Sequence, residues 1–199
     1  MKRFVVVLCL SVCSFSLAAP VQAVPISFDF STSGIGNGLY PELDVEASGL
    51  RVRILATDEN DHPQTISKWG SGLGVYSGGS DSKVIDGSGP DEWLQFFFAD
   101  RVQLLQVVFT LVQSGDDFSL AADGALSQSA AIPLSRVTDF SVAGSRFDFG
   151  VMDSNDDYRI QRIVVDDLVS APVPEPADWM LFSLGLVGLG GWFRLRRVC

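Results

Sequence analysis

Two sets of acidic and amide side chains are spaced as calcium ligands often are: Asp153, Asn155 and Asp157 in one, and Asp58, Asn60 and Asp61 in the other. Calcium is held by about six to eight oxygen atoms, mostly from carboxylates and carbonyls. The first set is not an EF-hand, because Tyr158 stands in place of the loop glycine and Val164 in place of the bidentate glutamate. A calcium site and a solvated acidic turn both fit each cluster, so Ca²⁺ is the one cofactor that the pattern suggests.

Three aromatic residues, Trp69, Tyr76 and Trp93, could bind a sugar ring by stacking. An aromatic side chain on a sheet or loop can present a flat apolar face to a ligand, although such residues more commonly pack in a core. Stacking on a sugar and packing in the core both remain open for these three residues. If they are exposed on one face, the partner that they imply is a polysaccharide.

The chain lacks the constellations of residues that catalysis usually needs. His62 is the only histidine, and the four glutamates of the body, at positions 42, 46, 59 and 92, show no paired spacing along one strand. No Gly-x-Ser-x-Gly or His-Glu-x-x-His motif occurs. Once a predicted export signal holding Cys9 and Cys13 is removed, only Cys199 remains, which leaves the body without a thiol for nucleophilic catalysis or zinc binding. We expect no catalytic residues and a protein that is not an enzyme.

The charge balance argues against nucleic acid as a partner. The chain has 14 Lys and Arg against 24 Asp and Glu, a formal charge of -10, and residues 24–171 alone hold 9 against 22, a charge of -13. Affinity for nucleic acid comes chiefly from basic side chains that neutralise phosphates. Of those 22 acids 18 are Asp, a residue that favours turns and cation ligation over helix surfaces.

The body, residues 24–171, has the periodicity of an all-β domain. Apolar residues alternate with polar ones in the runs 26–30, 50–54 and 146–149, and two more continuous apolar runs cover 93–98 and 102–112. Turn-forming stretches such as Ser77–Asp81, Asp86–Pro90 and Asp123-Gly124 separate the runs. About nine strands at this spacing predict a two-sheet β-sandwich of jelly-roll type.

The first 23 residues have the pattern of a secretory signal peptide. Lys2 and Arg3 precede an apolar run from Phe4 to Leu17, and Val21-Gln22-Ala23 places small residues where signal peptidase cleaves. We expect cleavage after Ala23. A retained membrane anchor and a lipoprotein signal ending at Cys13 are the alternatives, but the apolar run is short and a valine precedes that cysteine.

The C-terminal residues, 172–199, combine three different parts. A proline-rich stretch contains Pro174, Glu175 and Pro176, an apolar segment covers about 177–193, and Arg194, Arg196 and Arg197 fall in the last stretch, 194–199. The apolar segment is barely long enough for a transmembrane helix, and the arginines should stay cytoplasmic by the positive-inside rule. The sequence therefore predicts a single C-terminal transmembrane helix, with the body on the outer side of the membrane.

This tail resembles the PEP-CTERM sorting signal of Gram-negative bacteria, in the Pro174-Glu175-Pro176 motif, in the glycine-rich apolar stretch MLFSLGLVGLGGWF and in the RLRR end. The resemblance implies that an exosortase, a membrane cysteine protease, removes the helix and passes the protein to the cell surface or its polysaccharide matrix. The stretch IDGSGPDEWLQFFFADRVQLLQVVF of the body also looks like the domains of many such surface proteins, which often resemble carbohydrate-binding sandwiches.

These observations favour a non-enzymatic exported surface or matrix protein, associated with exopolysaccharide or biofilm. Signal peptidase and exosortase would process it, and the inner membrane would hold it only transiently. A carbohydrate-binding module that uses exposed aromatic residues is one alternative, and a protein simply anchored in the membrane by its C-terminal helix is the other.

Overall fold

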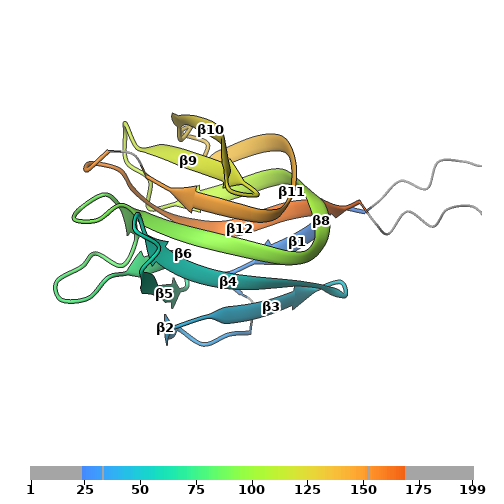
Figure 1. Cartoon of the computed structure of the whole chain (residues 1–199), viewed down its shortest axis with the longest axis horizontal. Helices are drawn as coiled ribbons and strands as arrows, with labels where there is room; N and C mark the ends of the chain where they lie inside the picture. The colour runs from blue at the N-terminus through green and yellow to red at the C-terminus, as the bar shows by residue number, and fades with distance from the viewer. Residues whose placement is uncertain (1–23, 33, 152, 169–199) are drawn as a thin grey trace, which may run out of the picture. The chain divides into compact units, whose positions relative to one another are not determined.

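The structure is a computed structural model and describes residues 24–32, 34–151 and 153–168. Residues Ala23–Ala171 form one compact unit. Its described residues form strands and no helix (Figure 1). The strands are β1 (Ile26–Asp29), β2 (Gly38–Tyr40), β3 (Leu43–Ala47), β4 (Leu50–Asp58), β5 (Pro63–Trp69), β6 (Gly72–Tyr76), β7 (Ile85–Asp86), β8 (Glu92–Thr110), β9 (Asp117–Ala122), β10 (Ala125–Ala131), β11 (Val137–Gly150) and β12 (Asp157–Asp167).

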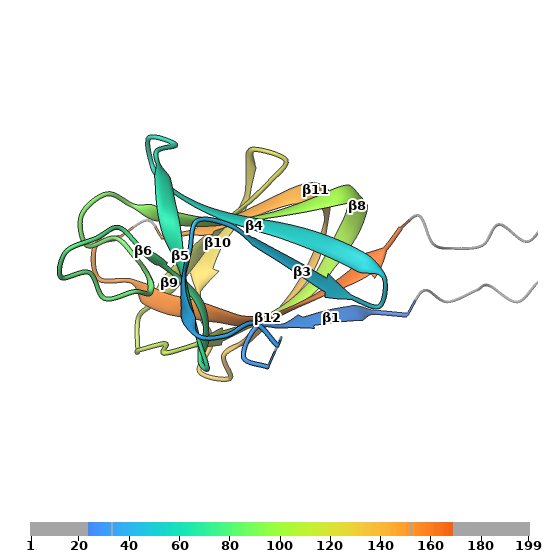
Figure 2. The same ribbon diagram turned by 90° about the horizontal axis from the view of Figure 1, so that it is seen from below.

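The centre of the fold is a closed barrel of antiparallel strands. β12 pairs with β6, β6 with β5, β5 with β4 and β4 with β8, and β8 then pairs with β12 to complete the ring. The other strands extend this ring: β1 and β7 lie on β12, β2 on β5 and β3 on β4, while β11 lies on β8 and carries β9 and β10. Figure 2 shows β4 on the opposite side of the barrel from β12 and β1.

β8 closes the barrel because it is long and bent. Its residues 92–98 pair with β4, whereas residues 102–110 pair with β12. Ala99, Asp100 and Arg101 lie exposed between the two halves, and the neighbouring β11 shifts register between Gly144 and Arg146 at the same point. Figure 1 shows the resulting curve of β8. One strand therefore belongs to both sides of the barrel.

The core forms because the strands place every second side chain inward. Leu94, Phe96 and Phe98 of β8 are buried, and Phe96 contacts Phe30 and Phe149 with ring centroids 5.8 and 5.9 Å apart. A second group of rings surrounds Phe109, which stacks on Phe118 at 5.3 Å and meets the edge of Tyr158 at 5.3 Å. All of these rings belong to one continuous apolar core.

The structure confirms the all-β class and corrects the arrangement of the strands. The pattern predicts about nine strands in two separate sheets, whereas the described residues form the twelve strands above in a sheet that closes on itself. The runs 93–98 and 102–112, expected as two strands, fall mainly in the single strand β8. The difference arises because β11 pairs along both halves of β8, which keeps the chain extended through the exposed bend.

The predicted signal peptide, residues 1–23, and the predicted sorting tail, residues 172–199, lie outside the described residues. Ala23, the motif at 174–176 and the arginines at 194, 196 and 197 therefore remain sequence-based predictions. Within the part of the chain that the structure describes, no helix has the length and hydropathy needed to cross a membrane.

Candidate functional site

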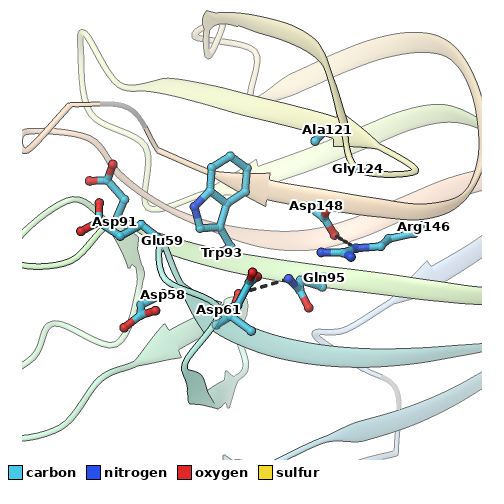
Figure 3. Close-up of a pocket in the computed structure, with 11 residues that line it drawn as sticks. Asp58, Glu59, Asp61, Asp91, Trp93, Gln95, Ala121, Gly124, Arg146 and Asp148 are labelled. Carbon is cyan, nitrogen blue, oxygen red and sulfur yellow. Dashed lines mark hydrogen bonds and ion pairs between the residues drawn. The ribbon is translucent and has the colours of Figure 1, made fainter.

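A cleft of about 450 Å³ lies against β4, β8, β9 and β11 and the turns at their ends (Figure 3). The residues that line it are Thr57, Asp58, Glu59, Asp61, Asp91, Trp93, Gln95, Ala121, Gly124, Arg146 and Asp148. It combines one large aromatic ring with several polar groups, and it is more polar than most ligand pockets, which are lined chiefly by apolar side chains.

Trp93 reaches the cleft because it is out of phase with the core-facing residues of β8. Leu94 and Phe96 point inward, so Trp93 and Gln95 project from the other face of the strand. Trp93 is paired between Thr57 of β4 and Gly150 of β11. A Cβ atom at Gly150 would lie only 2.5 Å from Cδ2 of the indole, so this glycine makes room for the ring. The half-buried indole thus rests against the β11 backbone and lines the cleft.

Two fixed polar contacts shape the cleft beside Trp93. The amide Nε2 of Gln95 donates to Oγ1 of Thr57 at 3.1 Å, and Nε of Arg146 donates to Oδ1 of Asp148 at 2.7 Å (Figure 3). Burial raises the pKa of Asp148, although the hydrogen bond from Arg146 acts in the opposite direction. The Arg146 guanidinium also lies over the ring of Phe97, at 5.2 Å from its centroid. These contacts hold the polar groups in place before any ligand arrives.

The cleft is strongly acidic. Five carboxyl groups line it, from Asp58, Glu59, Asp61, Asp91 and Asp148, against the single guanidinium of Arg146. Such a lining repels anions and suits neutral or cationic groups.

The predicted calcium cluster at 58–61 is a tight turn in which Asp58 organises its own loop. Its Oδ1 accepts the N–H groups of Asn60 and His62 at 2.8 and 2.9 Å, and its Oδ2 lies 3.0 Å from Nδ1 of His62. Asn60 is exposed, and Asp61 lines the cleft. Calcium binding by this cluster stays a prediction.

The second predicted calcium cluster also uses its carboxylates to hold the chain. Asp157 accepts hydrogen bonds from Nε2 of Gln113 at 3.0 Å, while Asp153 and Asn155 are exposed. Asp156, which the spacing argument left out, is buried and accepts the N–H groups of Asp117 and Asp153. A calcium ion on 153, 155 and 157 likewise stays a prediction.

The three candidate aromatic residues do not share one binding surface. Trp69 is 39% exposed and Tyr76 is half-buried, and Nζ of Lys83 lies 5.9 and 5.5 Å from the centroids of their rings. Neither ring lines the cleft that contains Trp93. Since none of the three is fully buried, sugar stacking stays open for each of them, separately rather than as one platform.

The structure brings together three carboxylates that the sequence patterns did not single out as a site, those of Asp81, Asp86 and Glu92. Each lies in or next to a glycine-rich stretch that the pattern assigned to turns. The alternation of core-facing and outward-facing residues along β8 could have pointed to this group. Glu92 lies two residues before Leu94 and four before Phe96, which places its carboxylate on the core-facing side of the strand.

Comparisons of the chain with protein-family models, with curated proteins and with solved structures give no match.

Proposed function

We propose that this chain is a non-enzymatic exported surface or matrix protein, sorted through its C-terminal tail. The observation that carries the proposal is the order of parts in residues 172–199: a Pro-Glu-Pro motif, a short glycine-rich apolar segment and a cluster of arginines. That order resembles a PEP-CTERM signal, and it follows a body with a secretory signal pattern in front of it. The proposed precursor is thus a β-barrel domain between a cleavable signal and a single transmembrane helix.

The compact body supports this proposal by its construction. Its described strands enclose one large apolar core, and residues 24–171 contain no cysteine. The core, rather than a disulfide, must therefore stabilise the domain after export. Its two ends lie side by side, because Ile26 of β1 pairs with Val165 of β12. The loops between β6 and β8 lie at the other end of the domain, at the left of Figure 1.

Processing of the tail is the direct test. Glu175→Ala, or replacement of Arg194, Arg196 and Arg197 by Ala, should leave unprocessed precursor in the inner membrane. Asp178→Ala is the matched control, since it removes a neighbouring acid outside the motif, and it should be processed normally. Normal processing of both tail variants would refute the sorting assignment and favour a plain membrane anchor.

The cleft supports a second candidate function, the binding of a saccharide. Trp93 provides a flat apolar face, and Gln95, Arg146 and Asp148 provide fixed polar groups beside it. This combination matches a sugar ring, which has apolar faces and hydroxyl groups at its edge. Because five carboxyl groups line the cleft, the ligand would be a neutral or amino sugar rather than a polymer of uronic acids.

Two tryptophan variants distinguish saccharide binding by Trp93 from a purely structural role for its indole ring. Trp93→Ala should weaken binding to a neutral polysaccharide at least about tenfold, equivalent to roughly 1.4 kcal/mol, whereas Trp69→Ala should leave it unchanged. Pull-down of the purified protein with insoluble neutral glucans and chitin measures both. Equal binding by the two variants, or a preference for anionic polymers, would refute saccharide binding at this cleft.

A further inference from the structure

Three carboxylates from one short run of the chain meet at the end of the barrel. Asp81 lies in the loop after β6, Asp86 lies in β7 and Glu92 begins β8. One oxygen of each lies within 4.8 Å of one oxygen of the other two. Asp86 is 5% exposed and Glu92 is 1% exposed, so most of this negative charge is shielded from water. Among the described residues, no ion pair with Lys or Arg neutralises any of the three.

Glu92 gives an independent sign that a ligand belongs here. Its Oε2 accepts the N–H of Asp86 at 3.2 Å, whereas no hydrogen bond of good geometry reaches its buried Oε1, although the side chain of Ser77 lies near enough to lower the pKa of the carboxyl group. Burying a carboxylate oxygen without a partner is costly, and native structures rarely leave one so. Burial, and then the nearby charge of Asp81, raise the pKa of Glu92 to about 8. The charged form of Glu92 is therefore disfavoured in the folded chain unless a cation lies beside it.

The two aspartates are held in position by their own loop. Asp81 Oδ2 accepts the N–H of Ser77 at 2.6 Å, and Asp86 Oδ1 accepts the N–H of Ser88 at 2.9 Å. The hydroxyl of Ser82 donates to Oδ2 of Asp86. These bonds fix the carboxylates close together in spite of their mutual repulsion, which is the arrangement that a bound cation stabilises.

We propose that Asp81, Asp86 and Glu92 bind one calcium ion, with the unpartnered Oε1 of Glu92 as one of its ligands. Ca²⁺ accepts oxygen ligands at about 2.3–2.6 Å, so oxygens up to nearly 5 Å apart can share it. Mg²⁺ requires a strict octahedron and usually keeps several waters, so three convergent carboxylates suit it less well. Three carboxylates leave coordination positions for backbone oxygens or water. The ion would join the β6–β7 loop to the start of β8, in a domain whose residues 24–171 include no cysteine for a disulfide.

The site goes beyond the proposed surface role, and it differs from the two clusters that spacing alone suggested. Asp153 and Asn155 lie between β11 and β12, and Asp157 begins β12, where it pairs with Asp86. Asp58 ends β4, where it pairs with Glu92, and Asn60 and Asp61 follow it. Variants in these loops therefore serve to locate the ion.

Calcium binding can be measured on the full chain, purified in mild detergent and stripped with EDTA. We expect titration with CaCl₂ to show one ion per chain by calorimetry and to raise Tm, because a ligand of the folded state alone stabilises it. Glu92→Gln keeps the shape of the side chain and should lose at least about tenfold in affinity and most of the Tm rise. Glu46→Gln, a surface variant on β3, should respond as the unchanged protein does.

Each other outcome would overturn the proposal. Absence of heat and of a Tm shift at about 5 mM Ca²⁺, well above the range for extracellular modules, would mean that Glu92 is buried as the neutral acid. A response retained by Glu92→Gln but lost in Asp153→Asn or Asp58→Asn would place the ion in one of the other loops. An equal affinity for MgCl₂ would refute selection of calcium. If Glu92→Gln fails to fold, Asp86→Asn supplies the same calorimetric test.

Discussion

Asp123 holds the bend of β11 against the turn between β9 and β10, and we predict that replacing it lowers the free energy of unfolding of the domain. The residue has a φ of 49° and starts the Asp-Gly turn of this hairpin, a conformation that Asp and Asn tolerate better than other residues with a Cβ. Its Oδ1 accepts the N–H groups of Ser145 and Arg146 at 2.9 and 3.0 Å. Its Oδ2 forms an ion pair with Arg101 at 3.2 Å, at the bend of β8.

The expected cost of Asp123→Ala is about 2–3 kcal/mol in the free energy of unfolding. Placing alanine in the left-handed region costs about 1 kcal/mol or more. The lost hydrogen bonds add about 0.5 kcal/mol each at a partly exposed site, and the exposed ion pair with Arg101 adds less than about 1 kcal/mol. Asp123→Gly keeps the turn and should cost less. Asp123→Asn keeps both the turn and an acceptor, and it should cost about 1 kcal/mol or less.

Thermal and urea unfolding of residues 24–171 measure these differences, and pH separates the contribution of the charge. The N–H of Ser145 above all lowers the pKa of Asp123 below its usual 3.8. A group with a lowered folded-state pKa stabilises above its unfolded value and loses this effect as the pH falls through the folded value. The Tm difference between the unchanged body and Asp123→Asn should therefore shrink from pH 7 to pH 3.

Two results would refute this reasoning. One is an Asp123→Ala variant within about 0.5 kcal/mol of the unchanged body, the range typical of an ordinary surface substitution. The other is a Tm difference for Asp123→Asn that stays constant into acid, because the carboxylate would then play no part in holding the bend.

Two further substitutions test the core and the closure of the barrel. Phe109→Ala, at a fully buried ring, should lower the unfolding free energy in urea by about 3–5 kcal/mol, while Leu126→Ala, 63% exposed, should stay within about 0.5 kcal/mol. Gly72→Ala should prevent stable folding, seen as loss of the near-ultraviolet circular dichroism signal, because Gly72 has a φ of 117° and a Cβ there would overlap the carbonyl of Ile160.

The local features of the fold could be predicted from the sequence because alternation and turn residues are local signals. The run 26–30 contains β1, and Asp123-Gly124 forms the hairpin turn that its residue types indicate. The closure of the barrel could not be predicted in the same way. Ala99, Asp100 and Arg101 have the composition of a break between strands. The distant β11 pairs on either side of them, with Phe97 and with Val102, so the chain continues as one strand.

The candidate site was only partly predictable for a similar reason. Trp93 stood out as an aromatic residue, but the space for its ring depends on Gly150, which is brought beside it by strand pairing. Asp81 and Asp86 were assigned to turns, which fits the loop position of Asp81, whereas Asp86 lies in β7 and pairs with Asp157. Their meeting with Glu92 depends on how the loop folds over the end of the barrel.

The intact mass of the protein recovered from the surface of the cells that produce it tests the central proposal most directly, because it records both processing events together. The proposal predicts a species that begins at Val24, after loss of the signal, and ends near Pro174-Glu175-Pro176. A surface species that retains Cys199 would contradict it, since the helix and the arginines would then serve only as a membrane anchor.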